Sequence, residues 1–537
     1  MPIRLTVEPT ALNHVDDRLF GQFLERAAPA EPGIENGLIP GTHELQPQVK
    51  TLMKLMHIPV IRFPGGTTVE STDWTNMIDN APGREAARPV LVEGNARISH
   101  AFGVDECLNL SDELGAATIL VVNFRDALTK KKPMQTAALH AAGLISYACT
   151  PAGGAIPDGM PDWAAVRARN GHKAPYRVAY VEIGNEWWAY YHDVTAALGT
   201  NDPKVMVAWY RDCLQAYVAA IRAVAPDVAF IIDAPHDGPG HEFHTQLIRD
   251  PWVRQNIRYL SPHIYAPGAW AKVTRDGKPV PVTTIPAREI WQALVAMPGA
   301  FSPEGENIAF GQRIDELTGL GCAVCTTEWN WNGWGDAKLP FDVQQASALG
   351  AAGFLNGLMR DGDRIPLATQ SMLVGSVWGV TAIRVDPTGN IPARLFPTGL
   401  VTALYSQFHG TSRYALRHDP LPRYSQPYRF LWGDDVPGPA VAYLDAVATG
   451  DKKALYLHLI NRSYDESCQV ELDVSAFKLA DTPAIHHLIL GGNAADGSTS
   501  SMRLTEQKIT HDANIVYVEL PARTVSVVEV QLVDTLK

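Results

Sequence analysis

The 537-residue sequence has few features of a membrane protein, a nucleic-acid-binding protein or a disulfide-stabilised protein. Its formal charge is −12, which disfavours nucleic acids and anionic membranes as partners because both require basic surfaces. No apolar run approaches the roughly 18 residues that a membrane helix needs. The composition, 46% apolar and 19% charged, is instead typical of a soluble globular protein with a sizeable core.

The sequence also offers little evidence of secretion. Its first residues lack the charged and apolar segments of a signal peptide. The six cysteines are scattered and do not form a disulfide framework. Cys322 and Cys325 have the spacing of a metal or redox pair, but they lie in a predicted strand and no second pair accompanies them. We therefore predict buried free thiols and a cytoplasmic location.

Two stretches of the chain share one pattern, an apolar strand that ends in a carboxylate beside tryptophan and asparagine. Residues 178–188 run through Gly184 into Asn185, Glu186 and Trp187, and residues 322–332 carry Glu328 in the same setting. A partly desolvated carboxyl group, an amide and aromatic rings suit carbohydrate chemistry. One such glutamate alone would be read as a solvated loop residue. Two matching strand ends favour a catalytic pair of carboxylates.

Strands and helices alternate through the first two thirds of the chain, with helices predicted between most strands. The predicted strands are 18–25, 59–66, 118–123, 178–186, 228–233, 259–265, 322–328 and 367–377. Eight strands in this alternation predict an α/β fold, a (β/α)8 barrel over residues 15–384. An open doubly wound sheet would alternate too, but it gives no reason for polar residues at so many strand ends. Those residues are Glu25, Arg62, Asn123, Asn185, Glu186, Tyr265, Glu328 and Gln370.

The pattern of predicted elements changes near residue 385. Strand-length runs at 440–447, 454–460 and 524–532 are separated by Gly, Asp and Asn turns. This pattern predicts an all-β sandwich. The strand expected at residues 2–8 is predicted to join it, so the second domain comprises residues 1–14 and 385–537.

Several short motifs, in this order and spacing, resemble glycoside hydrolase family 51, whose members are mostly α-L-arabinofuranosidases. They are residues 20–25, 62–66, 183–186, 263–265 and 327–330 in the barrel, with 443–448, 461–463 and 520–525 in the sandwich. The resemblance runs over nearly the whole chain. It implies a retaining barrel enzyme that acts on a carbohydrate substrate, with no metal and no organic cofactor. It also raises the possibility of a homo-oligomer.

The resemblance assigns roles residue by residue. It implies that Glu186 is the acid/base and Glu328 the nucleophile. The expected substrate-binding or supporting residues are Glu25, Arg62, Asn123, Asn185, Tyr265, Trp187 and Gln370. The mechanism requires Glu328 to be ionised, held so by donors such as Tyr265 or Arg62, and Glu186 to be protonated.

Some positions depart from the family pattern and leave the substrate open. Thr67 stands where many members have Asn or Cys, and Trp187 and Trp188 follow the acid/base. The main expectation is hydrolysis of terminal α-L-arabinofuranosyl residues. The alternatives are another retaining glycosidase (a galactofuranosidase, β-xylosidase or endoglucanase) or a carbohydrate-binding protein on a barrel without activity. The last is disfavoured because both carboxylates are present.

Other residues have simpler interpretations beside the functional ones. Arg62 is expected either to pair with Glu25 or to contact the sugar. About half of the tryptophans at 187, 188, 329, 331 and 334 are expected to line the cleft and the rest to lie in the core. His236, His241 and His244 fit no zinc spacing well. Gly65 and Gly66 lack the residues of a phosphate loop.

Overall fold

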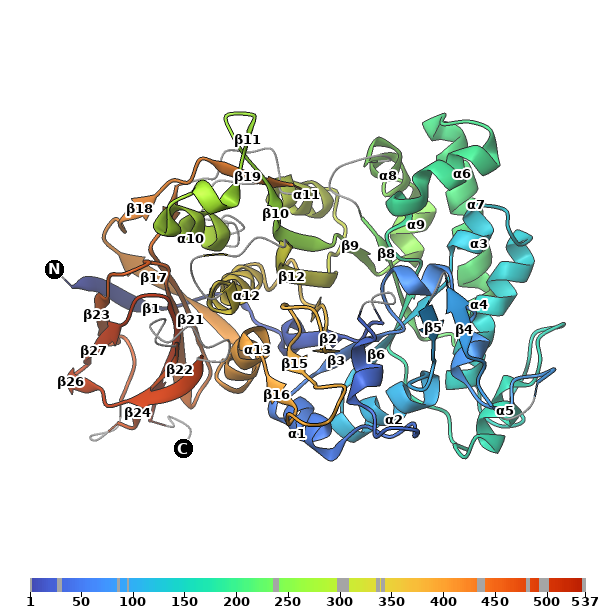
Figure 1. Cartoon of the computed structure of the whole chain (residues 1–537), viewed down its shortest axis with the longest axis horizontal. Coiled ribbons are helices and arrows are strands. Elements are labelled where there is room, and N and C mark those ends of the chain that lie inside the picture. Colours follow the sequence, from blue (N-terminus) through green and yellow to red (C-terminus); the bar gives the residue numbers. More distant parts are fainter. Residues whose placement is uncertain are drawn as a thin grey trace.

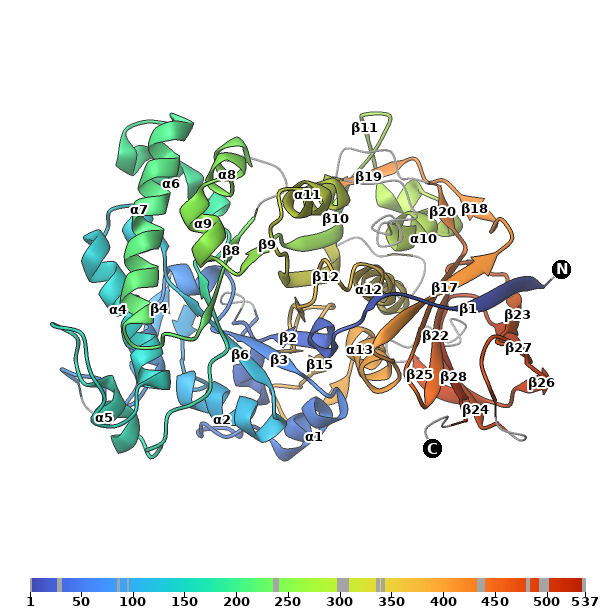
Figure 2. The same ribbon diagram turned by 180° about the vertical axis from the view of Figure 1, so that it is seen from behind.

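The computed structural model describes residues 2–26, 31–84, 87–93, 96–234, 241–296, 309–334, 339, 343–431, 440–479, 483–491 and 502–533. Two regions lie side by side (Figure 1). One consists of helices around a largely parallel sheet, and the other of long strands that include β1 near the amino terminus. The reverse view shows the same division (Figure 2).

The larger sheet contains a parallel ladder whose order is β10-β12-β13-β2-β3-β6-β7-β8-β9. Its strands are β2 (Gly21–Phe23), β3 (Val60–Phe63), β6 (Ala117–Val122), β7 (Tyr180–Ile183), β8 (Ala229–Asp233), β9 (Tyr259–Ser261), β10 (Ile264–Arg275), β12 (Thr326–Trp334) and β13 (Ala368–Gln370). Two further strands, β11 (Lys278–Val280) and β19 (Tyr428–Leu431), pair antiparallel with β10. The predicted α/β class with a parallel sheet is therefore confirmed.

Hydrogen bonds also connect β9 with the chain that enters β12. The N–H of Leu260 donates to the carbonyl of Ala323 at 3.0 Å, and the N–H of Cys325 donates to the carbonyl of Leu260 at 3.0 Å. Only Pro262 and His263 separate β9 from β10. These bonds link β9, at one end of the parallel order, to the other end, so the carboxyl ends of the strands face a common area.

Helices follow most strands of the ladder. They are α1 (Pro47–Leu55), α2 (Val104–Leu114), α3 (Arg125–Leu128), α4 (Met134–Cys149), α5 (Trp163–Arg169), α6 (Tyr191–Leu198), α7 (Pro203–Arg222), α8 (His241–Leu247), α9 (Pro251–Asn256), α10 (Ala287–Ala296), α11 (Ala309–Gly319), α12 (Val343–Arg360) and α13 (Pro397–Gln407). The start of α7 shows the local cause: the Asp202 side chain accepts the N–H of Lys204, and Pro203 occupies the first turn. Among the described residues, no helix combines the length and apolar character needed to span a membrane.

The inward side chains of the ladder form two layers of opposite character. The first is apolar and comprises Val60, Ile119, Tyr180, Ile231, Tyr259, Cys325 and Leu367. Side chains two residues further along a strand point to the same face. Those positions hold Arg62, Val121, Glu182, Asp233, Ser261, Thr327 and Thr369, all buried and all polar except Val121. A polar layer therefore lies between the apolar core and the carboxyl ends of the strands.

The second region is a sheet of order β25-β24-β28-β22-β21-β17-β1-β23-β27-β26. Its strands are β1 (Ile3–His14), β17 (Ser412–His418), β21 (Leu444–Gly450), β22 (Ala454–Asn461), β23 (Cys468–Asp473), β24 (Ile485–Gly491), β25 (Arg503–Gln507), β26 (Thr510–Asp512), β27 (Ile515–Leu520) and β28 (Thr524–Gln531). The strand at the amino terminus joins this sheet between β17 and β23. The strand expected at the amino terminus thus joins a large β-sheet, as predicted. Residues 385–537 are not all β, however, because α13 lies within them and β19 pairs with β10 of the other region.

Helix α12 lies between the two regions, and nearly all of its side chains are buried. An added Cβ at Gly350 would meet the ring of Trp331 at 1.8 Å, so this close approach requires glycine. At the carboxyl end of the helix, Arg360 forms an ion pair with Asp445 of β21, which also pairs with Arg462 at 2.5 Å. Burial favours the neutral acid, but the two arginines hold the pKa of Asp445 below its usual range. This buried triad joins the two regions.

Candidate active site

Glu186 and Glu328 come together in the folded chain. Glu186 lies just after β7, whereas Glu328 is the third residue of β12, which continues to Trp334 beyond the strand end expected at residue 328. His263 lies between them: its Nδ1 is 2.9 Å from Oε1 of Glu186 and 3.6 Å from Oε2 of Glu328. One oxygen of each glutamate and one nitrogen of His263 all lie within 4.8 Å of one another. Glu328 is 5% exposed and Glu186 is partly exposed. The two carboxylates selected from the sequence therefore form one cluster.

Arg62 holds three strand ends in position. Its Nη1 donates to Oε1 of Glu328 at 2.8 Å, its Nη2 donates to Oδ1 of Asn185 at 2.8 Å, and its Nε donates to Oε2 of Glu182 at 2.5 Å. The side chain is fully buried. Its ion-pair partners are thus Glu182 and Glu328, so of the two alternatives for Arg62 the one that pairs it with Glu25 does not hold. The parallel register brings β7 and β12 within reach of the guanidinium group.

Glu328 receives a second donor from Tyr265. The phenol hydroxyl lies 2.9 Å from Oε2 of Glu328, and it is also 2.5 Å from the hydroxyl of Ser371. Burial raises the pKa of the Glu328 carboxyl. His263 opposes that rise, the nearby charge of Glu186 adds to it, and Arg62 and the Tyr265 hydrogen bond oppose it. The nearby donors therefore stabilise the ionised form of Glu328 against the effect of burial.

The backbone at Glu186 has an uncommon conformation. Its φ of 46° and ψ of 50° lie in the left-handed region, which is unfavourable for a residue with a side chain. Gly184, two residues earlier, has φ of 85°. The N–H of Trp187 donates to Oδ2 of Asp233 at 3.3 Å and secures the turn from β8. Strained backbone held by neighbouring groups is common at functional sites.

Glu25 lies against the two glycines that follow β3. An added Cβ at Gly66 would meet Oε1 of Glu25 at 1.6 Å, and one at Gly65 would meet the Phe23 ring at 1.7 Å. Burial raises the pKa of Glu25 well above its usual value, and the charge of Glu328 raises it further. The two glycines therefore leave room for the partly exposed Glu25 side chain beside β3, within electrostatic reach of Glu328.

The structure adds residues that the sequence analysis did not select. They are Glu70, Glu182, Asp233 and His263, all buried. The alternation along each strand could have found two of them, because Glu182 and Asp233 follow inward Tyr180 and Ile231 by two residues. His263 begins the motif at residues 263–265. Glu70 ends a short 3-10 turn, η3 (Thr67–Glu70), where no regular pattern marks it.

Glu70 is a buried carboxyl group that binds several loops. It accepts the backbone N–H groups of Asn185, Phe124 and Arg125 at 2.8, 2.9 and 2.9 Å, and the hydroxyl of Tyr190 at 3.0 Å. Burial raises its pKa, and these bonds oppose the rise. Glu70 thereby fixes the turn that presents Asn185 and Glu186.

Two predicted substrate-binding residues lie elsewhere than expected. Trp187 is only 1% exposed, and its ring packs against Phe243 at 4.8 Å and Tyr210 at 6.0 Å between centroids. It is a core residue, and the prediction of sugar contact is corrected. Gln370 is fully buried and binds Gln22 and Thr402, with which it supports the strand pairing.

The other tryptophans near the two glutamates differ in burial. Trp329 and Trp331 are buried, whereas Trp188 is partly exposed and lies 5.7 Å from His263 between ring centroids. The side chain of Trp334 and the residue His236 lie outside the described part of the chain.

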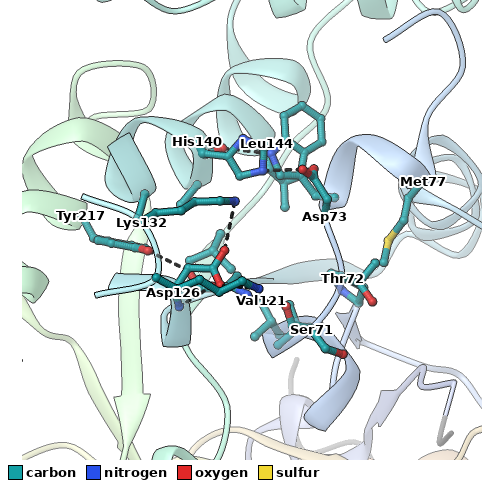
Figure 3. Close-up of a pocket in the computed structure, with 18 residues that line it drawn as sticks. Ser71, Thr72, Asp73, Met77, Val121, Asp126, Lys132, His140, Leu144 and Tyr217 are labelled. Atoms are coloured by element: carbon teal, nitrogen blue, oxygen red, sulfur yellow. Dashed lines mark hydrogen bonds and ion pairs between the residues drawn. The ribbon is translucent and has the colours of Figure 1, made fainter. Parts of the chain in front are cut away.

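Asn123 faces a neighbouring cavity. Its amide donates to the carbonyl of Val69 at 3.2 Å, and both residues line a cavity of about 210 Å³ beside α4 (Figure 3). Charged side chains on its wall are paired, Asp73 with His140 at 3.1 Å and Asp126 with Lys132 at 3.0 Å. The cavity wall contains neither Glu186 nor Glu328.

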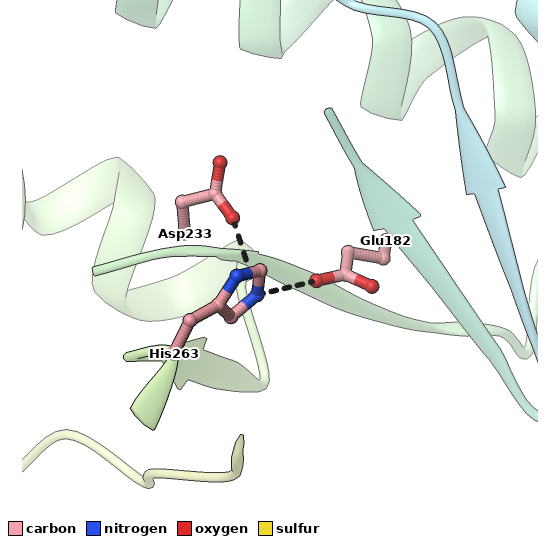
Figure 4. A group of neighbouring side chains, drawn as sticks. All are labelled: Glu182, Asp233 and His263. Carbon is pink, nitrogen blue, oxygen red and sulfur yellow. Dashed lines mark ion pairs between the residues drawn. The ribbon is translucent and has the colours of Figure 1, made fainter. Parts of the chain in front are cut away.

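Glu182, Asp233 and His263 form a buried group (Figure 4), and His263 connects it with Glu186. His263 Nε2 lies 4.0 Å from Glu182 and 3.9 Å from Asp233. These residue types can ligate metals, but the charge of Glu182 is already balanced by Arg62. Burial raises the pKa of Asp233 well above its usual value. The group fits an internal hydrogen-bonding network better than a cation site.

Comparison with known proteins identifies a similar domain and similar relatives. Residues 52–272 match the family model described as the alpha-L-arabinofuranosidase 1 domain. Over 181 residues, the chain is 25% identical to an intracellular exo-alpha-L-arabinofuranosidase of Bacteroides ovatus, which covers 32% of this chain and 31% of the relative. Over 205 residues it is 24% identical to the intracellular exo-alpha-(1->5)-L-arabinofuranosidase 1 of Bacillus subtilis, covering 36% and 37%. The matches thus span about a third of these relatives.

Solved structures share the fold over the whole chain. An α-L-arabinofuranosidase from Thermotoga maritima superposes with a TM-score of 0.72 at 18% identity, covering 99% of this chain and 100% of the other. The GH51 arabinofuranosidase from Xanthomonas axonopodis pv. citri gives a TM-score of 0.70 at 20% identity, with coverage of 99% and 100%. The domain match, the relatives and the shared fold therefore make the chain similar to glycoside hydrolase family 51 arabinofuranosidases.

Proposed function

We propose that this chain is a retaining, exo-acting α-L-arabinofuranosidase. Its catalytic domain would be a (β/α)8 barrel over residues 15–384, with a β-sandwich formed by residues 1–14 and 385–537. The observation that carries the proposal is the approach of Glu186 and Glu328, whose oxygens come within 4.8 Å. Retaining glycosidases hold their carboxyl groups about 5–5.5 Å apart, whereas inverting enzymes need roughly 6.5–9.5 Å to admit a water.

In this mechanism Glu328 attacks the anomeric carbon and forms a covalent glycosyl-enzyme. Arg62 and Tyr265 donate to its two oxygens and hold the carboxylate toward the sugar. Glu186 gives a proton to the departing oxygen and then takes one from the attacking water. The unequal surroundings support this division, because Glu328 is bonded to two donors whereas Glu186 is partly exposed.

Three residues next to the pair are proposed to bind the sugar. Glu25 lies against Gly66 in the same electrostatic cluster. The side-chain nitrogen Nδ2 of Asn185 has no hydrogen-bond partner among the described residues, while the side-chain oxygen Oδ1 accepts from Arg62. A positioned but unused donor suits a sugar hydroxyl. Tyr265 is the third, since its hydroxyl borders Glu328.

The names of the relatives support the choice of sugar and location. Both relatives described above are named intracellular arabinofuranosidases, and we propose the same substrate class and compartment here. Thr67 stands where many family members have Asn or Cys, and the bulky Trp188 is partly exposed close to Glu186. We propose that these two departures favour aryl glycosides and short oligosaccharides over intact arabinoxylan.

The test is kinetics on matched 4-nitrophenyl α-L-arabinofuranoside, β-D-galactofuranoside and β-D-xylopyranoside, with NMR of the first-formed anomer. We expect the arabinofuranoside to have the highest kcat/KM and the product to retain configuration. A preference for the pyranoside would reject the furanose assignment. An inverted first product would reject the double displacement.

A further inference from the structure

A chain of hydrogen-bonding groups leads from Glu186 into the buried polar layer. His263 Nδ1 lies 2.9 Å from Oε1 of Glu186, and its Nε2 lies 3.1 Å from the hydroxyl oxygen of Thr327. That hydroxyl in turn lies 2.6 Å from Oε1 of Glu182. Thr327 and Glu182 are fully buried and His263 is 5% exposed. Glu186, His263, Thr327 and Glu182 therefore form one continuous series of hydrogen-bonding groups.

The direction of these bonds follows from the number of protons available. Glu182 is an acceptor, because Arg62 donates to its other oxygen and, against the effect of burial, holds its pKa below the usual value. Thr327 has one hydroxyl proton, which it gives to Glu182. Its oxygen can then only accept from His263. The Nε2 atom of His263 must therefore carry a proton.

Ser261 is consistent with this direction. It accepts the backbone N–H of Thr327 at 2.9 Å, and its hydroxyl lies 2.7 Å from the Thr327 hydroxyl oxygen. Thr327 has two acceptor sites on that oxygen, one for Ser261 and one for His263. Turning the Thr327 hydroxyl toward His263 would remove a donor from the buried carboxylate of Glu182, which is unfavourable.

With Nε2 protonated, the short contact between Nδ1 and Glu186 needs one further proton. That proton lies either on Glu186, with a neutral imidazole, or on Nδ1, with an imidazolium and a carboxylate. We propose that Glu186 and His263 hold the acid/base proton in common, and that Thr327 and Glu182 are positioning residues that lock the imidazole tautomer. This inference rests on the proposed function, since it concerns the proton that Glu186 delivers.

The charges around His263 favour retention of this proton. Glu328 lies 3.6 Å from Nδ1, and Glu182 and Asp233 face Nε2 at 4.0 and 3.9 Å. Burial acts to lower the pKa of His263, but Glu328 and the bonds to Glu182 and Glu186 raise it well above its usual value. Further groups around the site are Arg62 beyond Glu182, and Glu25 and Tyr265 beside Glu328.

The proton balance follows the two chemical steps. In the first, the shared proton passes to the departing oxygen as the glycosidic bond breaks, which leaves a Glu186 carboxylate and a neutral His263 with Nε2 protonated. In the second, Glu186 takes a proton from water as the water oxygen attacks, and the shared state is restored. The proton on Nε2 stays on His263 in both steps, because it is donated in a hydrogen bond to the Thr327 hydroxyl oxygen throughout.

The substitution Thr327→Val tests whether the Thr327 hydroxyl fixes the tautomer of His263. Thr327→Ser is the matched control, because it keeps the hydroxyl. In the native protein, loss of the shared proton leaves a bare Nδ1 against a carboxylate. Without the hydroxyl, a neutral His263 can move its proton to Nδ1 and donate to Glu186. The alkaline limb of kcat/KM should therefore move to lower pH by about one unit in Thr327→Val, the equivalent of one buried hydrogen bond. Thr327→Ser should keep the native limb.

The second measurement does not depend on activity. In protein labelled with ¹⁵N-histidine, the His263 signals are assigned by their loss in a His263→Gln sample. We expect Nε2 to remain protonated from pH 5 to 9 in the native protein and in Thr327→Ser. In Thr327→Val, the neutral ring should change to the Nδ1–H tautomer.

A native His263 without a proton on Nε2, or an unchanged alkaline limb in a folded Thr327→Val sample, would overturn the proposal. The NMR result stands even if no glycoside is hydrolysed. A protonated Nε2 in a protein that hydrolyses no glycoside would reject the proposed function. It would still support the inference that Thr327 and Glu182 keep the proton on Nε2 of His263.

Discussion

Arg62 and Glu328 are 266 residues apart in the sequence, yet Nη1 of the arginine lies 2.8 Å from Oε1 of the glutamate in the buried site. The same guanidinium group binds Glu182 and Asn185. One side chain of β3 thus holds both the carboxylate of β12 and the amide next to Glu186. The positions of the two proposed catalytic carboxylates are coupled through it.

Replacing the nucleophile should abolish turnover without unfolding the protein. Glu328→Ala removes the group that attacks the anomeric carbon, so kcat on an aryl arabinofuranoside should fall by about 10³-fold or more. The measurement is steady-state kinetics beside a thermal melt. A folded variant with near-native turnover would exclude Glu328 as the nucleophile.

Replacing the acid/base should have an effect that depends on the leaving group. Glu186→Ala should hardly slow glycosylation by an activated dinitrophenyl glycoside but should strongly slow it for an alkyl glycoside, because only the latter needs a proton. Azide should accelerate turnover of the activated substrate and yield a glycosyl azide of retained configuration. Equal losses on both substrates, with no response to azide, would assign the acid to another residue.

Loss of Arg62 should destabilise the fold as well as the site. Arg62→Met leaves Glu182 and Glu328 buried without their cation, and breaking a buried pair in this way costs about 3–5 kcal/mol in the free energy of unfolding. Urea denaturation measures the change. The matched control is Arg417→Met, at an exposed pair with Glu8 of 3.2 Å, where we expect about 0–1 kcal/mol. Equal changes at the two positions would contradict the importance of the buried network.

Glu35 should make stability depend on pH. Burial raises its pKa to about 7, with Arg26 opposing the rise. A folded-state pKa above the unfolded value of 4.5 means that the folded protein favours the neutral acid. The stability that the neutral Glu35 carboxyl contributes is fully present below about pH 4.5 and is lost as the pH rises through about 7.

Glu35→Gln removes that titration. Relative to the native protein, the free energy of unfolding of this variant should therefore rise between about pH 4.5 and 7, by an amount of the order of a few kcal/mol. Urea denaturation of both proteins across this range measures the difference. A difference that stays constant with pH would show that Glu35 has an ordinary pKa in the folded protein.

Local pattern was sufficient for most strands and helices. Capping residues and breaks at glycine depend on neighbours in the sequence, so β7 and α7 could be predicted from the chain alone. The carboxylates Glu186 and Glu328 could be selected from their tryptophan and asparagine neighbours, although β12 begins at Thr326 and continues past Glu328 rather than ending there. The pairing of Tyr265 with Glu328 was also expected, from their positions at adjacent strand ends.

The partners of buried side chains depended on the register between strands far apart in the sequence. Arg62 pairs with Glu182 rather than Glu25 because β3, β6 and β7 align their inward positions. Trp187 is buried because α7 and α8 supply Tyr210 and Phe243 around it. The roles of Glu70, Asp233 and His263 likewise arise from loops and strands that meet only in the folded chain. A side chain's sequence neighbours determine its local conformation, but the charges and donors that set its protonation come from elements brought near it by tertiary packing.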